Sequence, residues 1–385
     1  MICGSLGRAT QSGIAVAVAV AIVATAGCSG ASVSPSPSES ASVPATEPAD
    51  LSAVSEEIAA GMQAHFDNSN TGAYDNVRAV LVTVGGQRLV ERYYESSADA
   101  TSNVHSVTKS VMSALIGIAL DEGHLDSVDQ TLADLLPSHV AEMSLQAKGI
   151  TLRQLLTMTG GLPSEGDVVD DFVTARGWVG KILADGPIQP PGQNFAYSSD
   201  GSHLLSAIMV QATGQSVLHY ARERLFAPLG IDTDPAAEPM MRTYPIRGYD
   251  QADFAWPTDP EGVHLGWCCL KLTARDMAKL GQLWLNDGDW NGTQLVSAQW
   301  VTESTQPHVE TGSSAVADQY GYHWWVTEVD GQPAFAAAGV GGQLVAVVPA
   351  LDLVVVVSSI ADVGNAQAED LMMMVSYVIV PTLRN

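Results

Sequence analysis

The sequence predicts an α+β fold in which an antiparallel sheet is assembled from both chain ends, flanked by helices, with a mostly helical lobe inserted between. Two runs with strand-like patterns, Val77 to Val84 and Arg88 to Tyr94, flank Gly85-Gly86, which is the pattern of a β-hairpin. Further strand patterns occur only after Tyr320. They cover Gly321 to Glu328, Gln343 to Val348 and Leu353 to Ser358.

The middle of the chain has helical periodicity and predicts an inserted lobe from about residue 106 to residue 300. Helices are expected there at Ser106 to Leu120, Thr151 to Met158, Gly201 to Thr213, Ser216 to Phe226 and Thr273 to Leu285. One more helix should begin near Leu51, and a last one should contain Leu371 to Val378. A crevice between the two lobes is the natural place for an active site.

The first residues predict export. Arg8 is the only charged side chain before an apolar run from Ile14 to Ala26, which is too short to span a bilayer but suits a signal peptide, residues 1–28. The run leads into Thr25-Ala26-Gly27-Cys28, which resembles a bacterial lipobox, so Cys28 is the expected lipidation site. The alternative is ordinary cleavage that leaves Cys28 unmodified.

A linker is expected from Ser29 to Asp50, where the composition is rich in Ser, Ala and Pro. The folded domain would then occupy residues 51–385. With a lipid on Cys28, this domain would be anchored to the outer face of the bacterial cell membrane, and the lipid would be its membrane contact.

The charge balance excludes one class of partner. The chain has 42 acidic and 17 basic residues and a net charge of −25, which repels phosphate backbones, so nucleic acid is not an expected partner.

The adjacent Cys268 and Cys269 are expected to be two small buried thiols. Neither Cys-x-x-Cys nor His-Glu-x-x-His occurs in the chain, so no metal site is predicted.

The tetrad Ser106-Val107-Thr108-Lys109 opens a strongly apolar helix. Residues three apart on a helix are neighbours, so the Lys109 amine can reach the Ser106 hydroxyl. The helix N-terminus favours negative charge on that oxygen, and burial makes Lys109 a better base. Ser106 would thereby become a nucleophile without histidine. The alternative is a capping serine beside a lysine that extends to solvent.

A second stretch contains Pro190-Pro191-Gly192 and, shortly afterwards, Tyr197-Ser198-Ser199 before a helix. A tyrosine hydroxyl near a lysine ammonium is favoured as phenolate, so Tyr197 can take and return a proton. Taken alone, Tyr197 fits better as an aromatic residue packed at a loop with its hydroxyl bonded, and only its combination with the tetrad favours the catalytic role.

The two stretches together resemble the serine β-lactamase and penicillin-binding protein superfamily, in particular class C β-lactamase-like esterases, DD-peptidases and 6-aminohexanoate-dimer hydrolases. Further matching stretches are Leu155 to Leu162, Ala227 to Gly230 and Leu272 to Lys279, and the resemblance covers about residues 55 to 380. It implies a β-lactamase/transpeptidase-like fold. It also implies that Ser106 is the acyl-accepting nucleophile, that Lys109 and Tyr197 share the general-base and general-acid roles, and that no cofactor takes part.

The sequence departs from the pattern of this superfamily twice. Ser199 stands where the second motif usually has Asn, and the third motif, Lys-Thr-Gly or His-x-Gly, has lost its basic residue. Its best counterpart is Ala337 to Gln343, where Gly339, Val340 and Gly341 would face the substrate and the Val340 N–H, with that of Ser106, would form an oxyanion hole. The alternative is a tight turn entering a strand.

We therefore expect a serine hydrolase that cleaves an ester or amide of a small molecule or peptide through an acyl-enzyme on Ser106. The missing basic residue argues against a β-lactamase, because that cation usually meets the substrate carboxylate. A penicillin-binding DD-peptidase or β-lactamase stays open as an alternative, and a non-enzymatic binding lipoprotein as a second one.

Overall fold

The computed structural model describes residues 51–69, 74–163, 177–243, 245–312, 316–360 and 368–384. The expected signal peptide, linker and lipidation site at Cys28 lie outside the described residues. Among those residues, no helix is long and apolar enough to cross a membrane.

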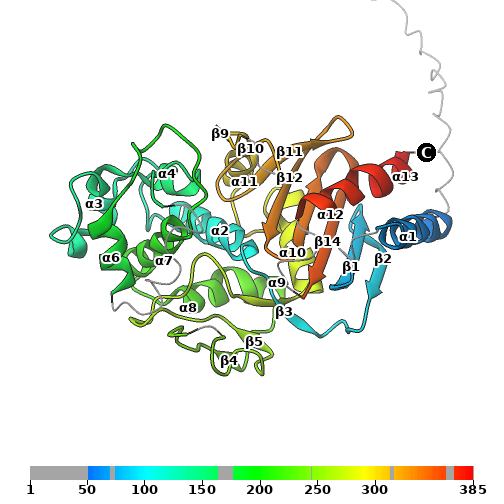
Figure 1. Ribbon diagram of the computed structural model, residues 1–385, viewed down its shortest axis with the longest axis horizontal. Coiled ribbons are helices and arrows are strands. Elements are labelled where there is room, and N and C mark those ends of the chain that lie inside the picture. The colour runs from blue at the N-terminus through cyan, green and yellow to red at the C-terminus, as the bar shows by residue number, and fades with distance from the viewer. Residues whose placement is uncertain are drawn as a thin grey trace, which may run out of the picture. The chain divides into compact units, whose positions relative to one another are not determined.

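The described residues form an eight-stranded sheet built from both chain ends, as expected (Figure 1). The order is β2-β1-β14-β13-β12-β11-β10-β9, and every neighbouring pair is antiparallel. In chain order the strands are β1 (Val77–Val84), β2 (Gln87–Tyr93), β9 (Val309–Glu310), β10 (Gln319–Tyr320), β11 (Trp325–Val329), β12 (Gln332–Gly339), β13 (Gln343–Val348) and β14 (Leu353–Ser359). The early hairpin joins the late strands through β1 and β14.

Helices cover both faces of this sheet. Alternate residues of a strand point to opposite faces. Val354 and Val356 of β14 accordingly pack in the cluster that contains helices α2 (Val107–Asp121) and α10 (Ala274–Leu285). Val355 and Val357 pack on the opposite face with α1 (Leu51–Asp67) and α12 (Ala368–Met374). The chain continues from α12 through a π-helical turn, η5 (Val375–Ile379), into α13 (Val380–Arg384). Both faces of β14 are therefore buried, which explains its unbroken apolar run.

Strand β12 was missed by the sequence analysis, which took Ala337 to Gln343 as the counterpart of the third motif, with a tight turn as the alternative. Its sequence, Gln-Pro-Ala-Phe-Ala-Ala-Ala-Gly, is rich in residues with low strand propensity. It is nevertheless paired on both sides, with β11 and with β13. Its alanines are buried on both faces, with Ala337 in the cluster on one side of the sheet and Ala336 and Ala338 in the cluster on the other.

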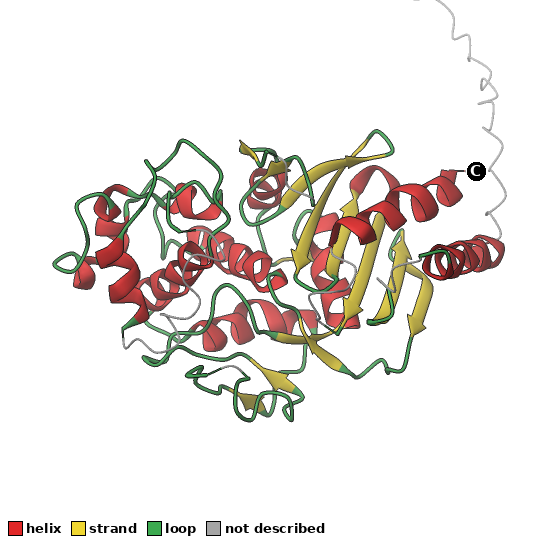
Figure 2. Ribbon diagram, viewed as in Figure 1, coloured by secondary structure: helices red, strands yellow, loops and turns green. Residues whose placement is uncertain are grey.

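The inserted lobe is mostly helical, and most of its helices lie at one end of the molecule, whereas α10 packs against the sheet (Figure 2). Its α-helices are α2, α3 (Leu132–Leu135), α4 (Leu152–Leu156), α6 (Trp178–Asp185), α7 (Ser199–Thr213), α8 (Val217–Ala221), α9 (Ala227–Leu229), α10 and α11 (Ala298–Thr305), with a π-turn, η3 (Arg222–Phe226), after α8. Short 3₁₀ turns are η1 (Pro137–His139), η2 (Ala147–Gly149) and η4 (Pro349–Leu351), the last between β13 and β14. Short strand pairs are β3 (Thr101–Asn103) with β6 (Lys271–Thr273), β4 (Ala236–Ala237) with β5 (Phe254–Ala255), and β7 (Asp289–Trp290) with β8 (Thr293–Gln294).

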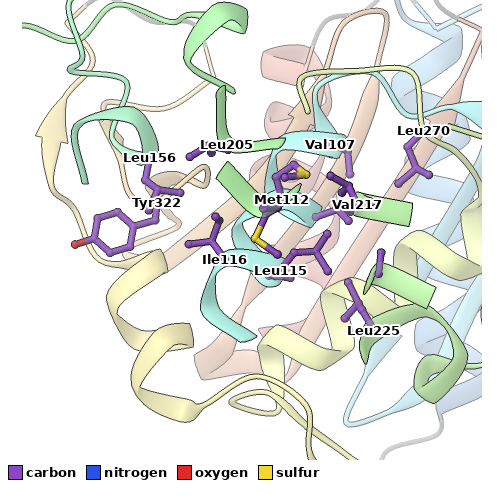
Figure 3. Close-up of a cluster of buried hydrophobic side chains, with 14 of the residues drawn as sticks. Val107, Met112, Leu115, Ile116, Leu156, Leu205, Val217, Leu225, Leu270 and Tyr322 are labelled. Atoms are coloured by element: carbon purple, nitrogen blue, oxygen red, sulfur yellow. The ribbon is translucent and has the colours of Figure 1, made fainter. Parts of the chain in front are cut away.

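Helix α2 is the central helix of this lobe and is buried from Val107 to Ala119. Figure 3 shows Met112, Leu115 and Ile116 on this helix beside apolar side chains that come from other helices and from the loop after β10, namely Leu156, Leu205, Val217, Leu225 and Tyr322. A helix surrounded in this way holds its N-terminus in a fixed place, and that end carries the tetrad.

Candidate active site

The start of α2 presents the Ser106 hydroxyl to Lys109. Ser106 is the N-cap residue of α2, but its side chain makes no capping hydrogen bond. Lys109 Nζ, one helical turn further on, instead donates a hydrogen bond to Ser106 Oγ at 3.1 Å. The expected approach of amine and hydroxyl is therefore present, and the alternative of a lysine extending to solvent is wrong, because Lys109 is only 1% exposed.

Lys109 Nζ meets oxygens from three separate parts of the chain. Besides Ser106 Oγ, it donates to Ser199 Oγ at 3.4 Å and to the carbonyl oxygen of Trp267 at 3.3 Å. It also lies 4.6 Å from the centre of the Tyr197 ring, within the range of a cation–π contact. The structure thus gathers Ser106, Lys109, Tyr197 and Ser199 at one point, as the sequence predicted.

Tyr197 is held in place by its backbone neighbours and by aromatic rings. The N–H of Ala196 donates to the carbonyl oxygen of Met158 at 2.8 Å, and Ser198 caps α7 through its side chain. The Tyr197 ring stacks on Trp325 of β11, with 5.5 Å between ring centres and 18° between ring planes. Tyr320 packs edge-on against the same ring at 6.2 Å.

The third predicted stretch lies against the segment that carries Ser106. Gly339 ends β12, and a Cβ at this position would lie 2.5 Å from the Val104 carbonyl oxygen and 3.1 Å from His105 Cβ. Glycine is therefore required for this close approach. Gly341 has a positive φ of 76°, so the stretch also contains the tight turn that we considered as an alternative. Val340, between the two glycines, is 44% exposed.

A histidine that the sequence analysis missed lies directly behind Lys109. His323 Nδ1 is 3.1 Å from the Lys109 carbonyl oxygen, and the His323 carbonyl oxygen accepts a hydrogen bond from Ser110 Oγ at 2.7 Å. Burial, together with the nearby Lys109 charge, lowers the pKa of His323 to about 3, so its ring is neutral at physiological pH. No local sequence motif identifies this residue, which lies more than two hundred positions from Lys109 in the chain.

The expectation of two free thiols at Cys268 and Cys269 is wrong, because the structure joins them in a disulfide between adjacent residues. Both residues are buried, as expected. Cys269 has a left-handed backbone with a φ of 72°, which lets the chain turn sharply enough to close the ring. The disulfide directly follows Trp267, whose carbonyl oxygen contacts Lys109.

Comparison with known sequences shows the relationship of the chain to other proteins. The family model described as Beta-lactamase matches residues 66–372. The chain is 27% identical over 268 residues to penicillin-binding protein 4 of Amycolatopsis lactamdurans, covering 64% of this chain and 68% of that protein. It is 25% identical over 304 residues to a 6-aminohexanoate-dimer hydrolase of Paenarthrobacter ureafaciens, covering 72% of this chain and 71% of that protein.

Solved structures show the same fold. A class C beta lactamase from Rhodobacter sphaeroides superposes with a TM-score of 0.62 at 20% sequence identity, covering 86% of this chain and 100% of that one. The β-lactamase/transpeptidase-like fold expected from the sequence is thereby confirmed.

Proposed function

Because the chain belongs to the beta-lactamase family of serine hydrolases, we propose that it cleaves an ester or amide bond through an acyl-enzyme on Ser106. The observation that carries this proposal is the 3.1 Å hydrogen bond between Lys109 Nζ and Ser106 Oγ at a buried helix start. A lysine so little exposed is costly to bury unless it has partners or a function.

In the proposed reaction, the Ser106 hydroxyl loses its proton to the Lys109 and Tyr197 pair while its oxygen attacks the substrate carbonyl carbon. The resulting oxyanion accepts hydrogen bonds from the backbone N–H groups of Ser106 and Val340. The bond to the leaving group then breaks, and the departing alcohol or amine takes the proton. Water releases the acyl group in a second round that uses the same residues in reverse. These steps need no metal or organic cofactor.

Ester and amide substrates of small molecules or peptides fit this chemistry. One relative is named as a hydrolase of 6-aminohexanoate dimer, and we extend amide cleavage from that relative to this chain as part of the proposal. Ser199 would then orient the substrate from its position 3.4 Å from Lys109 Nζ, with Gly339 and Gly341 lining the opposite side.

A penicillin-binding role is the second candidate, and the relationship to penicillin-binding protein 4 favours it. The third stretch weighs against it, since Ala337 and Ala338 precede Gly339 and no lysine or histidine stands there to meet a β-lactam carboxylate. A binding lipoprotein without catalysis is the third candidate. The intact set of Ser106, Lys109 and Tyr197 argues against that loss of activity.

We further propose that the protein is exported and anchored to the outer face of the bacterial cell membrane through Cys28. The motivating features are the apolar run from Ile14 to Ala26 and the small residues before Cys28. Radiolabelled palmitate incorporated into the wild-type chain, but not into a Cys28→Ser variant, is the expected result. Equal labelling of both chains would contradict it.

Ester turnover by the wild type and by a Ser106→Ala variant tests the catalytic proposal. The expected result is loss of p-nitrophenyl butyrate hydrolysis in the variant with an unchanged circular-dichroism spectrum. Ser113→Ala is the matched control, because Ser113 lies on the same helix and its hydroxyl is buried without a hydrogen-bond partner in the described residues. Equal turnover by Ser106→Ala and the wild type would contradict the proposal.

A further inference from the structure

The segment from Trp267 to Leu270 crosses the tetrad and contacts it at both ends. At one end, the Trp267 carbonyl oxygen accepts a hydrogen bond from Lys109 Nζ at 3.3 Å. At the other end, the Leu270 N–H donates to Thr108 Oγ1 at 3.4 Å, and the Leu270 carbonyl oxygen accepts from the Val104 N–H at 2.9 Å. The residues between these two anchor points are Cys268 and Cys269.

We propose that the Cys268–Cys269 disulfide is a positioning element for Lys109, because it fixes where the Trp267 carbonyl oxygen lies relative to the anchored Leu270. This inference rests on the proposed catalytic role of Lys109. The disulfide closes a small ring that includes the peptide bond between the two cysteines, so it restricts the backbone torsions that separate Trp267 from Leu270. Leu270 is held at both of its backbone polar groups, so the ring limits how far the Trp267 carbonyl can move relative to that anchored residue.

The left-handed backbone of Cys269 shows why a covalent restraint matters at this point. Its φ of 72° is a conformation that a side chain other than glycine adopts only at an energetic cost. Without the bond between the sulfurs, Cys269 is free to relax toward an ordinary negative φ. Such a change would rotate the peptide groups that precede it, including the Trp267 carbonyl.

The Trp267 carbonyl acts on the protonation of Lys109. A carbonyl oxygen bonded to an amine stabilises the protonated form, and it also fixes the direction in which the amine points toward Ser106. Among the described residues, titratable groups placed against Lys109 include Tyr197, whose ring it faces, and His323, which contacts its backbone. The ring of His323 stays neutral, because burial keeps its pKa at about 3.

The positioning element can be removed by reduction. One thiolate of a dithiol attacks one cysteine sulfur and releases the other cysteine as a thiol, which leaves a mixed disulfide. The second thiol of the dithiol then attacks the dithiol sulfur of that mixed disulfide and releases the first cysteine, so that the dithiol becomes a cyclic disulfide while Cys268 and Cys269 become two thiols. Cys269 lines a cavity of about 560 Å³ that Asn103 and Lys271 also border. That cavity gives a small dithiol a path toward the bond.

The test compares acylation of the full-length chain in detergent before and after treatment with dithiothreitol. The rate of labelling by a fluorophosphonate is measured across pH, and intact mass verifies reduction by the gain of two hydrogen atoms. A Cys268→Ser/Cys269→Ser variant cannot form the disulfide and provides the reference for its complete absence. A Cys3→Ser/Cys28→Ser variant is the matched control, since it carries the same chemical change at the two cysteines outside the segment.

We expect labelling of the reduced wild type to slow by roughly tenfold, the scale of a lost hydrogen bond to a charged group. The rising limb of its pH profile should move to lower pH, because the ammonium loses an oxygen that holds its proton. The Cys268→Ser/Cys269→Ser variant should match the reduced wild type and be insensitive to dithiothreitol. The control should behave like the wild type in both redox states.

Two results would overturn the inference while leaving the proposed function intact. One is an unchanged rate and pH profile after verified reduction. The other is a slower rate with an unmoved pH profile, which would indicate a general loss of folded protein and not a change at Lys109. If the oxidised wild type is not labelled at all, the proposed function fails and this inference fails with it.

Discussion

Trp325 stacks on Tyr197 with 5.5 Å between ring centres and only 18° between ring planes. The stack joins β11 of the sheet to the loop before α7 of the helical lobe, and Lys109 faces the same Tyr197 ring at 4.6 Å. The sheet therefore contributes to the active site through an aromatic contact, in addition to the close approach of Gly339 to the Ser106 segment.

Trp325→Ala is predicted to lower kcat/KM for p-nitrophenyl butyrate by roughly tenfold, because Tyr197 loses the ring that fixes its plane. Trp325→Phe should retain most of the activity, since a phenyl ring can still stack. Steady-state kinetics of both variants provide the check. Similar losses in the alanine and phenylalanine variants would show that stacking is not what matters.

Lys109→Met is predicted to slow acylation by about 10²- to 10⁴-fold, the usual contribution of a positioned proton-transfer group. Methionine fits the buried space without carrying charge, so the fold should remain intact. The rate of fluorophosphonate labelling measures the effect. Lys148→Met, in η2 of the helical lobe, is the control and should label at the wild-type rate.

Gly339→Ala is predicted to reduce acylation by roughly a hundredfold, because the added Cβ would lie 2.5 Å from the Val104 carbonyl oxygen and push β12 away from Ser106. The same substitution at Gly149, where a Cβ meets nothing within 4 Å, is the control. Labelling rates and melting temperatures of the two variants are compared. If Gly339→Ala is acylated at the wild-type rate, the third stretch does not form part of the active site.

The stability of the fold is predicted to fall as pH drops from about 6.5, the ordinary pKa of histidine, toward 3. His323 is neutral in the folded state down to a pKa of about 3, whereas the unfolded chain takes up a proton near 6.5. Protonation therefore favours unfolding in this window, and the stabilisation is fully present above it. In a variant without His323, the loss of unfolding free energy across this pH window should be smaller by a few kcal/mol.

Melting temperatures of the wild type and a His323→Gln variant between pH 7 and pH 4 test this expectation. The variant should show a shallower decline. His219→Gln is the control, because the His219 side chain is 58% exposed. Parallel curves for the wild type and His323→Gln would mean that other groups cause the acid sensitivity.

The parts of the fold that could be predicted from the sequence are those with strong local patterns. The Val-rich run of β14 and the glycine-separated hairpin of β1 and β2 are such patterns, and the spacing of Ser106 and Lys109 places them on one helical turn. Strand β12 could not be predicted, because alanine has little strand propensity and its partners supply the hydrogen bonds.

Site residues that belong to a sequence motif could be predicted. Site residues that reach the site only through tertiary contacts could not. Tyr197 and Ser199 were found only by combining the second stretch with the tetrad. His323 and Trp325 lie in a part of the sequence without a motif, and their roles depend on what the fold packs against Lys109 and Tyr197. The disulfide of Cys268 and Cys269 depends on a left-handed turn that the sequence does not signal.

The most direct test of the central claim is intact-mass spectrometry and peptide mapping of the full-length chain after exposure to a fluorophosphonate, p-nitrophenyl butyrate and benzylpenicillin in parallel. The account predicts one stable fluorophosphonate adduct on Ser106, turnover of the ester, and no penicilloyl adduct. A persistent penicilloyl group on Ser106 would favour the penicillin-binding role instead. An adduct on another residue, or none from any of the three compounds, would contradict the claim that Ser106 is the nucleophile.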